Sequence, residues 1–295
     1  MVFFRFKSLF KSIFLLFLIA ILPCSILAYP SSLGLQKDIG KCHTKSDIKA
    51  LLYRYEKAAF DDIKGAFLGV SVQAWKKCQD LIARTHRTLL SQLQVDRQTS
   101  DLYVPYNGSD LIKFALQCIQ KRGLKRNGIV ISFDNQQECS ASAGVQLILH
   151  SFKNDFCFKA AEIKDVNITI NPRFWYNPKL HVTSQPHGAL HTMHHEITHI
   201  LEGHSIKGIL IKATLKRHGY RESDIEKHPA ILAYNRVHEY IADLIPCILN
   251  RRIAEYQYKE ALLCKSGHLQ IIGASPIHPT PLDLYPWLEA IVALG

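Results

Sequence analysis

Residues 191–205 read HTMHHEITHILEGHS and hold five of the fifteen histidines of this 295-residue chain. Within this stretch, His195, Glu196 and His199 form an H-E-x-x-H motif. Residues four apart on a helix point the same way, so both imidazoles can reach one metal ion. The apolar neighbours of the motif indicate a buried helix, where unpaired histidines would be costly. The spacing therefore predicts a zinc site with His195 and His199 as ligands and Glu196 beside a metal-activated water.

A catalytic zinc ion needs a third protein ligand besides water, and the sequence downstream offers one. Residues 229–249 have the apolar pattern of a helix, and they contain Glu239 and Asp243, which lie four apart and so share a face. We expect Glu239 to be the third ligand and Asp243 to orient a ligand histidine from behind. His238, on the same helix, is the competing candidate for the third ligand.

Three short motifs together resemble the M48-type gluzincin zinc metallopeptidases. They are the H-E-x-x-H segment at His195, the E-Y-I-A-D sequence that begins at Glu239, and the H-P-T-P sequence at His278. That family commonly carries a histidine at the place of His204. The resemblance implies one Zn²⁺ ion, a catalytic role for His278 at the developing oxyanion, and a zincin-like fold. It also implies a peptide substrate that pairs with the strand 166–170 at the edge of a small sheet.

The chemistry implied by these residues is the hydrolysis of a peptide bond. Glu196 would act as the general base that takes the proton of the attacking water and passes it to the leaving nitrogen. We therefore expect a zinc-dependent metalloendopeptidase that acts on envelope or extracellular proteins. The alternative is a catalytically weak or inactive chaperone or adaptor of the cell envelope that keeps the zinc-bearing fold, because fold and site alone do not establish turnover.

The first 28 residues have the character of a secretory signal peptide. Arg5, Lys7 and Lys11 form a basic segment, an apolar run comes next, and Ala28 is the expected cleavage position. The alternative is an uncleaved N-terminal anchor, although the apolar run is short for a membrane span of about 20 residues. We therefore expect an exported protein, periplasmic or secreted. Removal of these three cations would lower the formal net charge from +11 to +8.

The distribution of charge limits the classes of binding partner that we expect. The basic residues are scattered and are not interleaved with aromatic residues, so nucleic-acid binding is not expected, whereas peripheral contact with an anionic membrane or envelope surface stays open.

No C-x-x-C pair occurs among the eight cysteines, which argues against a thiolate zinc knuckle. Export favours disulfide bonds, and Cys139/Cys157 and Cys247/Cys264 are the nearest neighbours in sequence.

The remainder of the chain has the composition of a globular protein, 47% hydrophobic and 21% charged, which argues against disorder. Apolar residues recur at helical spacing over 46–67, 72–94 and 110–120, so these segments are predicted helices. Thr44 and Ser46 are the two candidate caps of the first helix. The opening part of the mature chain is therefore expected to be helical.

A change of pattern separates this helical part from the middle of the chain. Segments 128–133 and 166–170 read as short strands, whereas 145–152 is apolar and fits either a strand or a helix. After Leu190 the pattern is again almost entirely helical, up to Gly267. We expect an α+β fold, mostly helical, with a small sheet between helical layers. The expected organisation is a signal peptide (1–28), a helical N-terminal region (29–124) and a zincin-like metallopeptidase domain (125–295).

Overall fold

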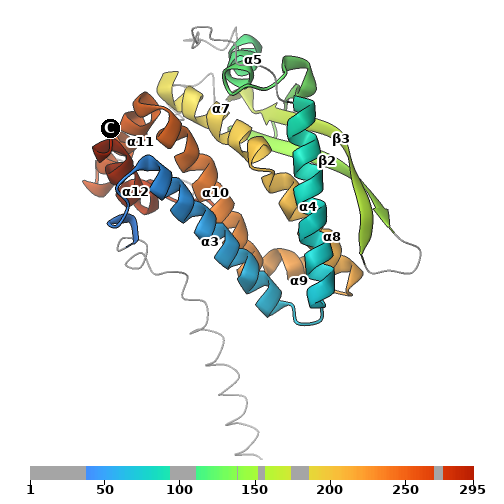
Figure 1. Ribbon diagram of the computed structural model, residues 1–295. Coiled ribbons are helices and arrows are strands. Elements are labelled where there is room, and N and C mark those ends of the chain that lie inside the picture. Colours follow the sequence, from blue (N-terminus) through green and yellow to red (C-terminus); the bar gives the residue numbers. More distant parts are fainter. Residues whose placement is uncertain (1–37, 94–110, 138, 152–156, 174–185, 269–274) are drawn as a thin grey trace, which may run out of the picture.

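The computed structural model describes residues 38–93, 111–137, 139–151, 157–173, 186–268 and 275–295 (Figure 1). These residues form nine α-helices and a three-stranded mixed sheet, so the expected α+β fold, mostly helical, is confirmed. The signal peptide predicted for residues 1–28 lies outside the described residues. Within the described ranges, no helix combines the length and the apolar character that crossing a membrane requires.

Two long helices, α3 (Lys45–Ala66) and α4 (Val72–Leu93), are the first elements of the described chain. The hydroxyl of Thr44 accepts a hydrogen bond from the amide of Asp47, and the Asp47 carboxylate accepts one from the amide of Thr44. This reciprocal pair is a capping box, which satisfies amides that the first helical turn leaves without partners. Thr44, rather than Ser46, is therefore the cap of the first predicted helix.

The sheet consists of β1 (Val130–Phe133), β2 (Ala141–Ser151) and β3 (Phe158–Ile170). Its order is β1-β3-β2, with β1 parallel and β2 antiparallel to β3. The ambiguous segment 145–152 thus contributes mainly to a strand. The expectation that residues 166–170 form the edge of the sheet is wrong, because they belong to β3 and pair with a strand on each side. In the described sheet, β1 and β2 are the edge strands.

The remaining elements are helical, and one long helix packs against several of the others. This is α10, which contacts α3, α7, α11 and α12, and which begins at a proline whose fixed φ suits a first helical turn. Its bounds agree with the predicted helix over 229–249. The elements are α5 (Leu111–Lys121), the 3₁₀ turn η2 (Arg126–Gly128), α7 (Pro186–Leu201), α8 (His204–Arg217), α9 (Glu222–Lys227), α10 (Pro229–Leu249), α11 (Arg251–Lys265) and α12 (Pro281–Ala293).

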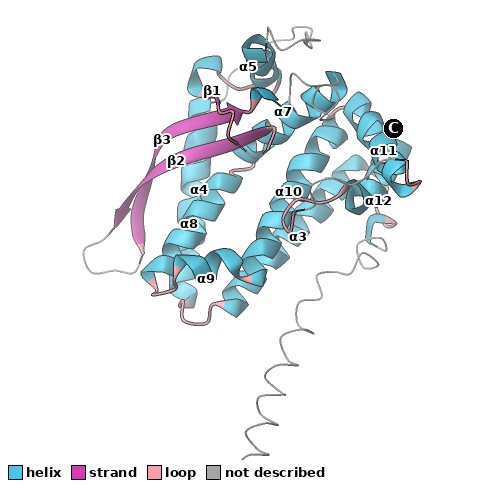
Figure 2. Ribbon diagram, turned by 180° about the vertical axis from the view of Figure 1, so that it is seen from behind, coloured by secondary structure: helices cyan, strands magenta, loops and turns pink. Residues whose placement is uncertain are grey.

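Helices cover one face of the sheet. α4 packs against β3, whereas α7 and α8 pack against β2. Figure 2 shows the opposite face in front of α4 and α8, with no described helix over it. Exposed apolar side chains on the strands, such as Val130 and Ile148, agree with an uncovered face. For the described residues, the expected placement of the sheet between helical layers is therefore wrong.

A single cluster of buried apolar side chains joins the N-terminal helices to the rest. Leu52 of α3, Met193 of α7 and Ile241 of α10 are all members of this core. α7, the helix with the H-E-x-x-H motif, packs against α10 and against β2, and α10 in turn packs against α3. No disulfide joins any two of the seven cysteines that the structure describes, and the disulfides expected from export receive no support.

Candidate metal centre

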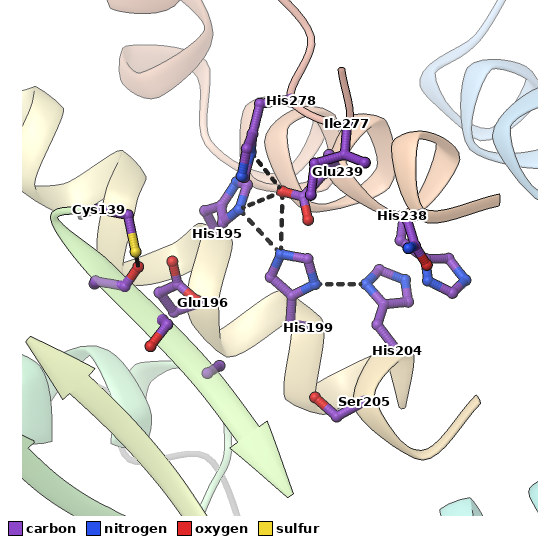
Figure 3. Close-up of a pocket in the computed structure, with 14 residues that line it drawn as sticks. Cys139, His195, Glu196, His199, His204, Ser205, His238, Glu239, Ile277 and His278 are labelled. Atoms are coloured by element: carbon purple, nitrogen blue, oxygen red, sulfur yellow. Dashed lines mark hydrogen bonds and ion pairs between the residues drawn. The ribbon is translucent and has the colours of Figure 1, made fainter. Parts of the chain in front are cut away.

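Two helices from distant parts of the sequence meet at the H-E-x-x-H motif. α7 carries His195 and His199 one turn apart, and α10 places Glu239 opposite them (Figure 3). The two Nε2 atoms lie 3.0 Å apart, and Oε2 of Glu239 lies 3.2 Å from His195 Nε2 and 3.5 Å from His199 Nε2. All three side chains are nearly buried, with 12–13% of their surface exposed. The structure therefore brings together the three residues predicted as ligands.

The spacing of these three atoms fits a tetrahedral zinc ion. Zinc–ligand bonds of about 2.0–2.2 Å in a tetrahedron place neighbouring ligand atoms about 3.3–3.6 Å apart. Oε2 of Glu239 is also buried, and the described residues give it no hydrogen bond, although three imidazole nitrogens lie 3.0–3.5 Å away. A buried carboxylate oxygen without a donor is costly unless a cation satisfies it. The residues present thus fit a bound metal.

Asp243 supports the first histidine from behind. It lies one turn after Glu239 on α10, and its Oδ1 lies 2.7 Å from Nδ1 of His195. An ionised carboxylate can only accept, so Nδ1 of His195 donates and Nε2 keeps its lone pair for a metal when the ring is neutral. Burial opposes a charge on His195, but Asp243 and Glu239 outweigh it and raise the pKa of this imidazole well above its usual value. Asp243 therefore lies where the sequence spacing predicts.

Glu196 lies beside the candidate ligands in a cavity of about 300 Å³. Its side chain is buried, and burial raises the pKa of its carboxyl group. Figure 3 shows this carboxyl group on the side of the cavity that faces β2. The cavity is lined by β2 and the segment before it (Cys139, Ala141, Ser142, Ala143), by α7 and α8 (His195, Glu196, His199, His204, Ser205), and by α10 and the segment before α12 (Asn235, His238, Glu239, Ile277, His278).

His278 reaches the same carboxylate from the segment before α12. Its Nδ1 lies 3.0 Å from Oε2 of Glu239, and about half of its side chain is exposed. The neighbouring carboxylate of Glu239 raises the pKa of His278 above its usual value. The structure thus places the third motif at the mouth of the cavity, within reach of the predicted ligands.

A second group of titratable side chains lies behind His199. Nδ1 of His204 lies 2.9 Å from Nδ1 of His199. His238, the competing candidate ligand, turns away from His195 and places its Nε2 3.0 Å from Oε1 of Glu56 on α3. We call His204, His238 and Glu56 the buried triad. The structure therefore separates His238 from the predicted ligand set and joins it to a different helix.

Two parts of the site were not foreseen from the sequence. Glu56 interrupts the apolar stripe of its helix between Leu52 and Phe60. A charged residue on such a stripe indicates that it has a buried partner, but the sequence does not identify that partner. The contribution of β2 to the cavity was also missed, because the apolar run that contains it fits a strand or a helix equally.

No family model, no curated protein and no solved structure matches this chain. The resemblance to gluzincins that the sequence suggests therefore has only three short motifs behind it. The chemistry of the site rests on the placement of His195, His199, Glu239, Asp243 and Glu196.

Proposed function

We propose that this chain is a zinc-dependent endopeptidase. The observation that carries the proposal is the convergence of three metal-ligand atoms with a buried glutamate in one cavity. His195, His199 and Glu239 would hold one Zn²⁺ ion, and Glu196 comes directly after the first ligand. Bound zinc would acidify a water and polarise a carbonyl oxygen of the substrate.

The protein residues then supply the proton transfers. Glu196 accepts the proton of the attacking water and delivers it to the leaving nitrogen, because a carboxylate beside the water can do both in turn. His278, at the mouth of the cavity, is placed to donate a hydrogen bond to the oxyanion that develops on the substrate. Asp243 acts through His195 and holds its ring in the orientation that binds metal.

The free edge of β2 supports a peptide as the substrate. In the described sheet, β2 pairs with β3 on one side only, and its first residues line the cavity beside Glu196. An extended peptide can add to such an edge through main-chain hydrogen bonds, which bring a peptide bond to the site without demanding particular side chains. The secretory signal peptide that we expect over residues 1–28 supports action on envelope or extracellular proteins.

Metal analysis joined to a cleavage assay tests the proposal. The purified full chain is analysed for metals, and its release of peptides from casein is measured as prepared, after treatment with a chelator, and after zinc is restored. We expect one zinc per chain and cleavage that disappears with the chelator and returns with zinc. A chain that binds no zinc contradicts the proposed centre. Bound zinc without cleavage, together with suppressed aggregation of unfolded protein, would support the adaptor hypothesis instead.

A further inference from the structure

The buried triad connects the candidate metal centre to α3. Nδ1 of His199 contacts Nδ1 of His204 at 2.9 Å, and the His204 ring stacks on the His238 ring with centroids 4.1 Å apart and planes 7° from parallel. His238 in turn contacts Glu56, and Lys207 also forms an ion pair with Glu56. His204 and His238 are buried, and Glu56 is nearly so. The proposed reaction makes no direct use of any residue in this group.

The triad does not fit a second metal ion, although its three donor atoms lie within 4.8 Å of one another. An imidazole lone pair lies in the plane of its ring, so two parallel stacked rings direct their lone pairs side by side instead of to one point. The ammonium group of Lys207 is already bound to Glu56, where it would repel a cation. The arrangement is therefore a set of hydrogen bonds and ring contacts.

The contact between His199 and His204 determines where each proton lies. One of the two Nδ1 atoms must donate and the other must accept. Nε2 of His199 faces His195 and Glu239, so a bound metal needs its lone pair and the ring proton must lie on Nδ1. His204 must then accept at Nδ1 and carry its own proton on Nε2, an atom that is buried and has no hydrogen-bond partner among the described residues. The opposite assignment would place a proton on Nε2 of His199 and block the metal.

The position of the His204 ring is fixed by what packs around it. His238 covers one face of the ring, and Tyr234 packs edge-on against His238 with centroids 4.2 Å apart. Because Glu56 accepts from Nε2 of His238, that ring cannot turn without losing a buried charge-assisted hydrogen bond. His204 thus contacts Nδ1 of His199 as Asp243 contacts Nδ1 of His195, with an imidazole in place of a carboxylate.

We propose that His204, held by His238 and Glu56, is a positioning residue that keeps His199 in the tautomer that binds metal. This inference rests on the proposed metal site. It assigns a role to Glu56, which lies on α3 and 143 positions before His199. The N-terminal helical region thus contributes to the centre through two intervening rings.

Two variants of His204 separate hydrogen bonding from packing. His204→Phe keeps a ring to stack on His238 but removes the acceptor, whereas His204→Asn keeps an oxygen acceptor near the position of Nδ1 and loses the ring. Zinc affinity of the full chain is measured by competition with a chromophoric chelator. We expect His204→Phe to weaken zinc binding about 10–100-fold and His204→Asn to restore most of that loss. Equal affinity of the wild type and His204→Phe, or equal losses in both variants, would overturn the inference.

A measurement on the wild-type chain keeps the inference testable if the variants do not fold. Nitrogen NMR of the zinc-loaded protein, labelled at histidine, reports which ring nitrogens carry protons. We expect a proton on Nδ1 of His199 and on Nε2 of His204, and a proton on Nδ1 of His204 contradicts the inference. Failure of the proposed function gives a different result. A chain that binds zinc with this tautomer pattern but cleaves no peptide would contradict the peptidase activity and leave the inference about His204 intact.

Discussion

Glu239 is the residue on which the candidate centre depends most. Burial opposes its ionisation, but His195, His199 and His278 outweigh burial and hold the pKa of this carboxyl group well below its usual value. A carboxylate that stays ionised among imidazoles is suited to bind a cation, because it supplies charge as well as a ligand atom. The helix α10 therefore brings a charged ligand to the two imidazoles of α7.

Glu239→Gln should weaken zinc binding more than about 100-fold, since it removes the charge of a direct ligand and the loss should exceed that seen for residues behind the ligands. The measurement is zinc affinity by chelator competition, and Glu255→Gln on α11 is the matched control because its exposed ion pair with Arg251 lies apart from the cavity. Unchanged zinc stoichiometry and affinity in Glu239→Gln would assign the third ligand elsewhere.

Sequence spacing accounts for part of the residue-scale arrangement. The i, i+4 relation places His195 and His199 together, and the same relation places Glu239 with Asp243, so local helix geometry predicts each pair. The meeting of the two pairs is a matter of tertiary packing. His278 entered only through the family resemblance, because a histidine between loop residues carries no local signal of its partner. Glu56 had no predictable partner, since His238 lies 182 positions away.

At the scale of the elements, α7 and α8 are joined by a close turn near the site. Gly203 has φ +66°, a conformation that disfavours any residue with a side chain, and it directly precedes His204. A Cβ at this position would lie 2.7 Å from the ring of His86, whose Nε2 contacts the carbonyl of Leu201 at 2.7 Å. The ring has little freedom to move, so the close turn requires glycine.

Gly203→Ala is expected to destabilise the protein by about 1–3 kcal/mol, through backbone strain and the clash with His86. Gly208→Ala, within α8 and with open space around its Cβ, is the matched control and should be neutral or stabilise by about 0.4–1 kcal/mol. Urea unfolding measures both. If the two alanine variants unfold at the same urea concentration, the junction is not constrained in this way.

α3 should make the stability of the protein sensitive to acid. Burial alone would raise the pKa of Glu56, but His238 and Lys207 outweigh it and lower that pKa from 4.5 to about 2. A folded pKa below the unfolded value gives stability that is present above about pH 4.5 and is lost as the pH falls towards about 2. The shift corresponds to about 3 kcal/mol.

Urea unfolding at several values between about pH 5 and pH 2.5 tests this dependence. The free energy of unfolding should fall less steeply with acid in Glu56→Gln, whose side chain does not ionise, than in the wild type. Parallel pH profiles for the two proteins would show that Glu56 does not contribute. The comparison isolates this residue because all other carboxyl groups are common to both.

Elements with a strong local pattern were predictable, and their arrangement was less so. α10 agrees with its predicted bounds because Pro229 opens it and its apolar run continues to Leu249. The edge of the sheet was misassigned because the order of strands depends on contacts between distant segments. The alternation of apolar and polar residues along 166–170 indicates a strand but not its position in the sheet. The helix α12 was not predicted, although Thr280 and Asp283 form a capping box before it.

At the scale of the whole molecule, the candidate centre is a cross-link between α7 and α10, two helices of the common core. A ligand that binds only the folded state stabilises it by about 2.7 kcal/mol when its free concentration is 100 times its dissociation constant. For a chain of this size, that corresponds to about 4–6 °C in the unfolding midpoint.

The thermal midpoint of the full chain should therefore fall when a chelator is added and recover when excess zinc is supplied. Differential scanning calorimetry gives the measurement, and magnesium in place of zinc is the control, because a site with two imidazoles favours zinc over a hard cation. An unfolding midpoint that changes with neither chelator nor zinc would argue against any metal bridge between the helices.

Glu196→Gln provides the most direct measurement of the central claim. The substitution removes the proposed general base and leaves His195, His199 and Glu239 in place, and Glu202→Gln, at the end of the same helix and outside the cavity, is the matched control. With equal zinc loading, we predict that casein cleavage falls about 10²–10⁴-fold in Glu196→Gln and stays near the wild-type rate in Glu202→Gln. Cleavage by zinc-loaded Glu196→Gln at the wild-type rate would contradict the proposed mechanism.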